Sequence, residues 1–303
     1  MSGAPRDPPS GVPGPLIGVV NPEDPRLALY RHLNDPARRM RMETDESVFV
    51  VEGRLAVERL LTSVYTVRSL LVDDHQVTAV GDLVAATRAQ GAPVFVGSRP
   101  VVAGTVGFAL HRGVVAVANR PAPFDPGRVL TDAAGTPTAG GPPLVAILEG
   151  LNDHENVGAL FRNAAAFGVG GVLLDPTSAD PLYRRSVRVS VGHVLQVPFA
   201  RLVPWPTGLH RVRATGFVVA ALSPRPAGAH GVAAATLAEL KAWMTGPAHP
   251  VGVALLLGAE GPGLTESARG AADVAVHIPM ADGVDSLNVA TAAAVAFHAL
   301  AGL

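Results

Sequence analysis

Polar residues that could do chemistry stand where an apolar run ends near the middle of the chain. After the apolar segment LVAILEG, Asn156 and Arg162 lie six residues apart, which is almost two turns of a helix. We therefore expect both side chains to face one crevice. An amide can orient a hydroxyl group, and the planar guanidinium of arginine pairs well with phosphate. A capping asparagine and a surface arginine explain each residue equally well when it is taken alone.

Two further polar clusters follow apolar runs near the C-terminus. The stretch LLLGAEGPGLT places Glu260 in a glycine-rich loop, where the backbone can approach a ligand closely. The stretch IPMADGVDSLNVA places Ser286 and Asn288 before a long apolar helix, and we expect Ser286 to cap that helix. Each cluster alone is also typical of a tight turn or a helix cap. Neither contains the phosphate-binding P-loop sequence or the nucleophile elbow of serine hydrolases.

The elements that must position these clusters are strands that alternate with helices. This alternation, between residues 144 and 303, predicts a mostly parallel sheet covered by helices. Sites in such sheets lie beyond the carboxyl ends of the strands. All three clusters follow predicted strands, so we expect them to meet at that edge of the sheet.

The sequence divides into four predicted segments. Residues 1–20 are rich in proline and glycine and are expected to be flexible. Residues 21–120 predict a smaller α/β domain. Residues 121–143 consist of small, turn-forming residues without periodicity, which indicates an interdomain linker. Residues 144–303 carry the three clusters.

The composition limits the classes of function. The chain of 303 residues has no cysteine, which excludes disulfides, thiolate metal sites and cysteine nucleophiles. The net charge is −1, so any binding of nucleic acid must come from local patches. The sequence begins without a signal-peptide pattern, and its longest apolar run is too short to span a membrane. These features predict a cytoplasmic protein without membrane attachment.

Taken together, the three clusters resemble the signatures of the SpoU-type (TrmH-like) RNA ribose 2′-O-methyltransferases of the SPOUT superfamily. Their order and spacing match over roughly residues 144–303, while residues 21–120 resemble, more loosely, the ribosomal-protein-like (L30e-like) substrate-binding domain of many members. The matching residues are Asn156, Gly158 and Arg162 in the first motif, Gly258, Glu260, Gly261, Gly263 and Leu264 in the second, and Ile278–Met280 with Ser286–Val289 in the third.

The resemblance implies a fold, a cofactor and a reaction. The fold would be a SPOUT-type α/β sheet with a C-terminal trefoil knot, acting as a homodimer. The cofactor would be S-adenosyl-L-methionine, bound by backbone groups around Gly258, Ile278 and Leu287 and released as S-adenosyl-L-homocysteine. No metal would be needed. The catalytic residues of the family correspond to Arg162, Asn156, Glu260, Ser286 and Asn288 of this chain.

The substrate implied is structured RNA, with ribosomal RNA, 23S rRNA in particular, favoured over transfer RNA. Arg184 and Arg188 stand on one predicted helical segment, where they could contact phosphates or simply form a solvated face. Two other functions stay open. A nucleotide-binding oxidoreductase would need a G-x-G-x-x-G turn, of which AFGVGGVLLD is a poor imitation. A non-catalytic RNA-binding protein would use the N-terminal domain alone and bind no cofactor.

Overall fold

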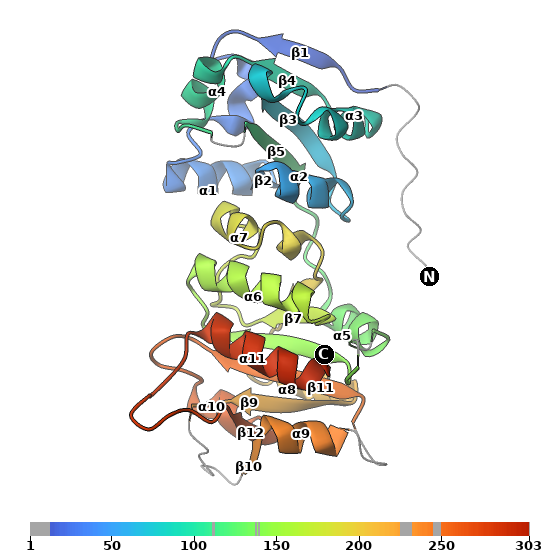
Figure 1. Cartoon of the computed structure of the whole chain (residues 1–303), viewed down its shortest axis with the longest axis vertical. Coiled ribbons are helices and arrows are strands. Elements are labelled where there is room, and N and C mark those ends of the chain that lie inside the picture. Colours follow the sequence, from blue (N-terminus) through green and yellow to red (C-terminus); the bar gives the residue numbers. More distant parts are fainter. Residues whose placement is uncertain are drawn as a thin grey trace. The chain divides into compact units, whose positions relative to one another are not determined.

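The computed structural model describes residues 13–110, 113–136, 138, 140–224, 232–244 and 250–302. The chain forms two compact units. Unit 1 comprises the residues up to Pro121 together with Leu182–Leu195, and unit 2 comprises Ala122–Pro181 and Gln196–Leu303. Each unit is built around its own sheet (Figure 1).

Unit 2 contains a seven-stranded sheet in the order β10-β12-β9-β11-β6-β7-β8, and every neighbouring pair of strands is parallel. The predicted α/β fold with a mostly parallel sheet is therefore confirmed. The trefoil knot concerns how the chain is threaded and stays a prediction. The strands are β6 (Leu144–Glu149), β7 (Gly171–Leu174), β8 (Phe199–Arg201), β9 (Phe217–Leu222), β10 (Ala233–Thr236), β11 (Gly252–Gly258) and β12 (Val274–His277).

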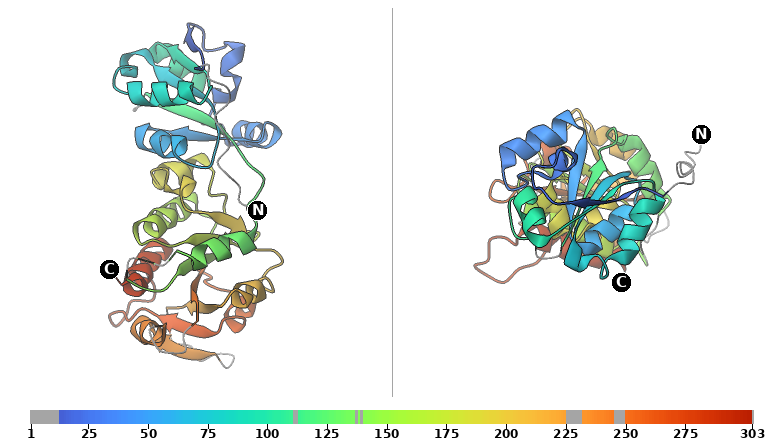
Figure 2. Two further views of the ribbon diagram at one scale, coloured as in Figure 1. Left: turned by 90° about the vertical axis from the view of Figure 1, so that its right-hand side faces the viewer. Right: turned by 90° about the horizontal axis from the view of Figure 1, so that it is seen from above.

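Helices lie on both faces of this sheet (Figure 2), which explains why its central strands are apolar at every position except Glu149, the last residue of β6. One face packs against a core that includes Ile147, Leu173 and Leu256. On the other face the C-terminal helix lies beside α6 (Figure 1). The helices of unit 2 are α5 (Pro126–Ala134), α6 (His154–Ala166), α8 (Leu209–Ala214), α9 (Leu237–Met244), α10 (Glu266–Gly270) and α11 (Val289–Ala301).

The segment expected to be a linker contains a helix. Asp125 caps α5 by accepting a hydrogen bond from the N–H of Arg128, and Pro126 opens its first turn. The helix buries Val129, Leu130 and Ala133 in the core of unit 2. Small residues around the helix conceal its pattern in the sequence. The folded part of unit 2 thus begins before residue 144.

Unit 1 contains a five-stranded mixed sheet in the order β1-β4-β3-β5-β2, in which β5 runs antiparallel to β3 and β2. Its strands are β1 (Leu16–Val19), β2 (Val48–Glu52), β3 (Val67–Asp73), β4 (Val94–Gly97) and β5 (Val114–Asn119). Its helices are η1 (Pro25–Tyr30), α1 (Pro36–Asp45), α2 (Arg54–Leu61), η2 (Asp74–Gln76), α3 (Gly81–Ala89), α4 (Arg99–Val106), α7 (Arg184–Val189) and η3 (His193–Leu195).

Part of the segment expected to be flexible is a strand. Residues 1–12 lie outside the described residues, but Leu16–Val19 pair with β4 in a parallel register. The L30e-like character of unit 1 stays a prediction. No helix within the described ranges is long and apolar enough to cross a membrane. The apolar C-terminal run is α11, which packs against α6.

The helix α7 is part of unit 1 although its flanking strands, β7 and β8, belong to unit 2. Arg184 forms an ion pair with Glu52 of β2, at 3.0 Å, and donates to the backbone oxygen of Leu33. Its guanidinium also lies 4.2 Å from the ring centroid of Phe108. The side chain is only 13% exposed, so these contacts hold Arg184 as an internal structural residue of unit 1.

Candidate functional site

The three polar clusters meet beyond the carboxyl ends of neighbouring parallel strands in unit 2. β6 and β11 pair so that Glu149 lies opposite Gly258. The first strand continues into α6 and the second into the glycine-rich loop. The chain after β12 leads to the N-terminus of α11, which packs against α6. The parallel order of the strands therefore brings together residues that lie more than a hundred positions apart.

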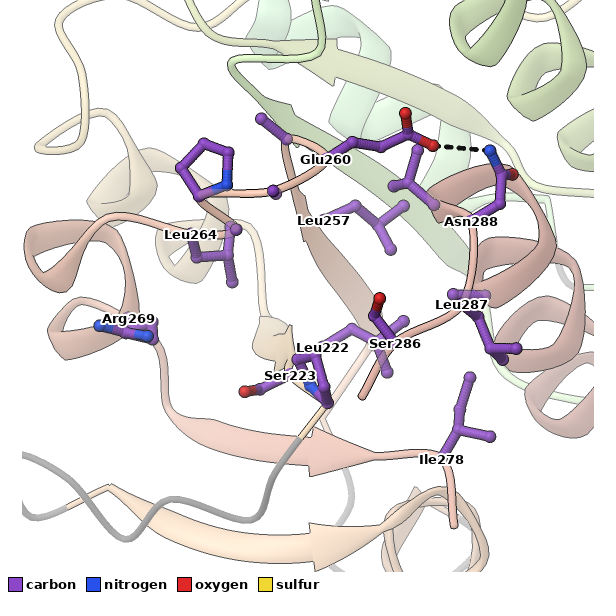
Figure 3. Close-up of a pocket in the computed structure, with 18 of the residues that line it drawn as sticks. Leu222, Ser223, Leu257, Glu260, Leu264, Arg269, Ile278, Ser286, Leu287 and Asn288 are labelled. Atoms are coloured by element: carbon purple, nitrogen blue, oxygen red, sulfur yellow. Dashed lines mark hydrogen bonds between the residues drawn. The ribbon is translucent and has the colours of Figure 1, made fainter. Parts of the chain in front are cut away.

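Asn288 is the residue that joins the clusters. Its side-chain oxygen accepts hydrogen bonds from the N–H groups of Ala290 and Thr291, which makes it the N-cap of α11. Its Nδ2 donates to Asn156 Oδ1 at 2.8 Å and to Glu260 Oε1 at 2.7 Å. Figure 3 shows the second of these bonds. Because the cap fixes the amide, Asn288 holds one residue from each of the other two clusters.

Ser286 was expected to cap the helix, and that expectation is wrong. The helix begins two residues later than predicted, and Asn288 occupies the capping position. Both residues are acceptable N-caps, so the sequence alone does not choose between them. Ser286 instead lies exposed beside a cavity (Figure 3).

The loop after β11 is bent back tightly on the strand. The N–H of Gly263 donates to the backbone oxygen of Ala259, and both Gly261 and Gly263 have positive φ. A Cβ atom on Gly258 would lie 2.4 Å from the backbone of Gly263, so only glycine fits there. These glycines let the loop present Glu260 outward from the end of the strand.

A cavity of about 540 Å³, which we call the first cavity, opens between this loop, the end of β12 and the start of α11 (Figure 3). Its lining includes all three residues predicted to bind a cofactor, namely Gly258, Ile278 and Leu287. Glu260 is the only carboxylate and Arg269 the only cation among the described residues that line it. Arg269 was missed because it stands on α10, outside the three sequence motifs.

The glycine-rich loop is anchored from behind by a buried carboxylate at the end of β6. Glu149 is 5% exposed. Its Oε2 accepts from the N–H of Thr265 at 2.8 Å, and its Oε1 accepts from the Thr265 hydroxyl and from Trp205 Nε1, each at 2.7 Å. Thr265 is also the N-cap of α10. Glu149 thus fixes the point where the loop ends and the next helix begins.

A second cavity, of about 550 Å³, adjoins the first on the other side of the loop. Glu149, Asn156, Asp175, Trp205 and Glu260 contribute to its lining, and Glu260 lines both cavities. Burial opposes the ionisation of Asp175, but hydrogen bonds outweigh it and lower the pKa of this carboxyl. The donors are Ser178, Thr177 and the N–H of Gly150.

The predicted arginines lie in different settings. Arg162 stands on α6, exposed, and lines neither cavity. The expectation that Arg162 and Asn156 face one crevice is therefore wrong. Six residues of helix turn Arg162 by about 120° from Asn156, which is buried. The described residues offer Arg162 no ion-pair partner, so its guanidinium is open to a ligand. Arg188 is exposed on α7, whereas Arg184 is held in the ion pair with Glu52.

Within the described ranges, no group of three or more His, Asp or Glu side chains is arranged to hold a metal ion. Metal-free chemistry stays a prediction. The arrangement that is present consists of an amide and a carboxylate joined by a fixed asparagine at the boundary of two cavities. Such a boundary can align a donor group held in one cavity with an acceptor group held in the other.

Comparison with known proteins assigns the family. Residues 143–298 match the SpoU rRNA Methylase family. An uncharacterized tRNA/rRNA methyltransferase of Mycobacterium tuberculosis is 44% identical over 281 residues, which cover 92% of this chain and 90% of the relative. The 23S rRNA (guanosine-2′-O-)-methyltransferase RlmB of Yersinia pestis is 31% identical over 215 residues, 70% of this chain and 79% of the relative.

Solved structures share the fold. An AdoMet-bound rRNA methyltransferase from Sinorhizobium meliloti has a TM-score of 0.72 at 23% identity, over 94% of this chain and 97% of the other. This similarity extends across both units, and the sequence matches extend across the three motifs that meet at Asn288. The chain therefore belongs to the SpoU rRNA methylase family.

Proposed function

We propose that this protein transfers a methyl group from S-adenosyl-L-methionine to a ribose 2′-hydroxyl of ribosomal RNA, with 23S rRNA as the favoured target. The observation that carries the proposal is the pair of hydrogen bonds from Asn288 to Asn156 and Glu260, at the boundary of two cavities. The name of the Yersinia pestis relative, 23S rRNA (guanosine-2′-O-)-methyltransferase RlmB, supports the choice of RNA.

The residues around the first cavity suit the proposed cofactor. A volume of about 540 Å³ lies within the range of small-molecule sites. Its apolar wall includes Leu257, Ile278 and Leu287, and the glycine-rich loop exposes backbone groups that could bind the adenine. The Glu260 carboxylate suits the positive sulfonium, and Arg269 suits the carboxylate of the methionine part. S-adenosyl-L-methionine, when bound, supplies an electrophilic methyl group on this sulfonium.

The polar residues at the boundary would position the attacking ribose. A free hydroxyl is a poor nucleophile, so its oxygen must be aligned with the methyl carbon and its proton must leave. Asn288 holds Glu260 and Asn156 in place. Ser286, which lines the first cavity, can bind the cofactor or the ribose.

Arg162 would act on the RNA backbone. A guanidinium is protonated under ordinary conditions, so the simplest role for it is to bind the phosphate beside the reacting ribose and stabilise developing negative charge. An exposed arginine without an ion-pair partner among the described residues is suited to this role. The bound phosphate would bring the guanidinium to the reacting hydroxyl.

Unit 1 would provide further contacts to folded RNA. Arg188 is the candidate phosphate contact, and its replacement by alanine should weaken RNA binding a few-fold and reduce the salt dependence by about one ion. We do not propose Arg184 as a phosphate contact, because its guanidinium already pairs with Glu52. We further propose that the protein acts as a knotted homodimer, which light scattering and a structure of the assembled protein would test.

The experiment that tests the proposed function is transfer of labelled methyl from S-adenosyl-L-methionine to purified ribosomal and transfer RNA. Products would be mapped as alkali-resistant linkages, which only a 2′-O-methyl group creates. We expect label in ribosomal RNA with the wild type and a loss of about 100-fold or more with Arg162→Ala. Arg128→Ala serves as the matched control, since it removes a 69% exposed arginine of unit 2 to which we assign no contact with RNA.

The outcomes separate the possible functions. Label confined to transfer RNA would change the substrate class and keep the reaction. Cofactor binding without label in either RNA would contradict ribosomal RNA as the substrate and would exclude transfer RNA as its replacement. If the protein binds neither S-adenosyl-L-methionine nor its product, the proposed enzymatic function is contradicted. A non-catalytic RNA-binding function would then be left.

A further inference from the structure

The proposed function assigns no ligand to the second cavity. It is about as large as the first, at about 550 Å³, and the segment Ala259–Gly263 separates the two. Glu260 lines both cavities, and Asn156, which is bonded to Asn288, lines the second. A group placed in the second cavity would therefore lie next to the residues that we assign to methyl transfer.

The charge of the second cavity limits what can enter it. Four carboxylate side chains contribute to its lining, and none of its described lining residues is a lysine or arginine. A phosphate group would be repelled there. Two of the four carboxylates, Glu149 and Asp175, already accept several internal hydrogen bonds each, so they serve structural purposes. The lining suits a neutral group that carries N–H donors.

An aromatic ring in the wall of the second cavity further limits the class of ligand that can bind there. Trp205 is half-buried, packs against the core of unit 2, and is held in orientation by the hydrogen bond from its Nε1 to Glu149. Every nucleobase has a flat face that can stack on such a ring. A fixed indole in an acidic cavity is therefore suited to a base and unsuited to the RNA backbone.

An unpaired donor provides a second, independent observation. Asn156 is only 7% exposed, and its Oδ1 accepts from Asn288. Its Nδ2 has no hydrogen-bond partner among the described residues. This nitrogen is not among the fully buried polar atoms, so it can reach a ligand in the cavity and donate a hydrogen bond to it. Since Asn156 lines the second cavity, that ligand would sit there.

We propose that the second cavity receives the base of the nucleotide to be methylated, with Trp205 as its stacking surface and Asn156 Nδ2 as a hydrogen-bond donor to the nucleotide. This inference rests on the proposed function. It requires the base to be unstacked from its neighbours, so the target lies in a loop, bulge or single strand, or is flipped out on binding. The ribose attached to the base then faces Glu260 and the first cavity.

The test uses the fact that the chain has two tryptophans, Trp205 and Trp243. Trp243 is 47% exposed on α9 and lines neither cavity, so Trp243→Phe leaves Trp205 as the only indole reporter. This variant, saturated with S-adenosyl-L-homocysteine to fill the first cavity, would be titrated with guanosine, adenosine, cytidine and uridine. Ribose 5-phosphate, which lacks a base, is the control ligand.

We expect saturable quenching of Trp205 fluorescence by at least one nucleoside and none by ribose 5-phosphate. Trp205→Phe, whose fluorescence comes from Trp243 alone, should show no saturable change. In methyl transfer, Trp205→Leu should raise the KM for RNA about tenfold without changing the affinity for S-adenosyl-L-homocysteine.

A flat titration for all four nucleosides, in protein that still binds S-adenosyl-L-homocysteine, would overturn the assignment of the base to this cavity. Quenching by ribose 5-phosphate would overturn it as well, because the backbone would then be what binds. A wild-type KM for RNA in Trp205→Leu would equally contradict it. These results are distinct from a failure of the proposed function, in which the wild type methylates no RNA, because nucleoside binding is measured without methyl transfer.

Discussion

The two cavities of unit 2 share one wall, the segment Ala259–Gly263, but their linings differ. The first has an apolar wall, exposed backbone and one described residue of each charge, Glu260 and Arg269. The second has four carboxylates and a tryptophan. The contrast indicates that the two cavities take different ligands, one with both charges and one that is neutral and aromatic. The polar residues bonded to Asn288 lie where the ligands would meet.

The largest expected effect comes from removing the residue that joins the two sides. Asn288→Ala should reduce methyl transfer by about 100-fold or more, because Glu260 and Asn156 lose their common partner. It should also lower the free energy of unfolding by about 1 kcal/mol, since α11 loses its N-cap. Labelled methyl transfer and urea unfolding measure the two effects.

Asn288→Asp separates these two effects. Aspartate caps helices as well as asparagine does, so the free energy of unfolding should stay close to that of the wild type. The Nδ2 donor is lost, however, and a second carboxylate stands beside Glu260. Activity should therefore fall as far as in the alanine variant. An active Asn288→Asp would contradict the role of the Nδ2 hydrogen bonds.

Arg269→Gln should affect the first cavity alone. If Arg269 binds the carboxylate of the methionine part, the variant should bind S-adenosyl-L-homocysteine about tenfold more weakly by calorimetry. Its affinity for 5′-methylthioadenosine, which lacks that carboxylate, should equal that of the wild type. Equal weakening of both ligands would indicate a general disturbance of the cavity and contradict the charge pairing.

Glu149→Gln should disturb the wall that both cavities share. Glu149 accepts three hydrogen bonds, two of them from Thr265, and the single oxygen of glutamine cannot replace both carboxylate oxygens. We expect a loss of about 2 kcal/mol in the free energy of unfolding. The exposed Glu266→Gln on α10 is the matched control and should stay within about 0.5 kcal/mol of the wild type.

Asp175, which lines the second cavity, should make the stability of the protein depend on pH in the acid range. Its pKa is lowered in the folded protein, so its contribution to stability is fully present above the ordinary aspartate pKa of about 3.9 and is lost as the pH falls through the folded value. Asp175→Asn should therefore be less stable than the wild type near pH 7, by about 1 kcal/mol. The difference should shrink below about pH 4, and a constant difference across pH would contradict the assignment.

The sequence predicted the site more fully than its surroundings. Asn156, Glu260 and Asn288 stand directly after strands or at helix starts, so the parallel sheet alone brings them together. Trp205 and Arg269 reach the cavities through tertiary packing of loops and a short helix, which no local pattern reveals. The motif spacing therefore predicts the shared wall better than it predicts the two linings.

The different settings of Arg184 and Arg188 also show that local sequence does not predict tertiary contacts. Arg184 and Arg188 look alike in the sequence, but the partner of Arg184 is Glu52, which stands on β2 of the other predicted domain. No local sequence pattern around Arg184 or Glu52 predicts that ion pair. The missed helix α5 has a related cause, because its apolar side is short and flanked by small residues.

The most direct test of the two-cavity account is a crystal structure of the protein with S-adenosyl-L-homocysteine. We expect the ligand in the first cavity, with its adenine near Ile278 and Leu287, its carboxylate at Arg269, and its sulfur facing the hydrogen-bonded pair of Asn288 and Glu260. A ligand bound in the second cavity, or with its sulfur turned away from Glu260, would contradict it.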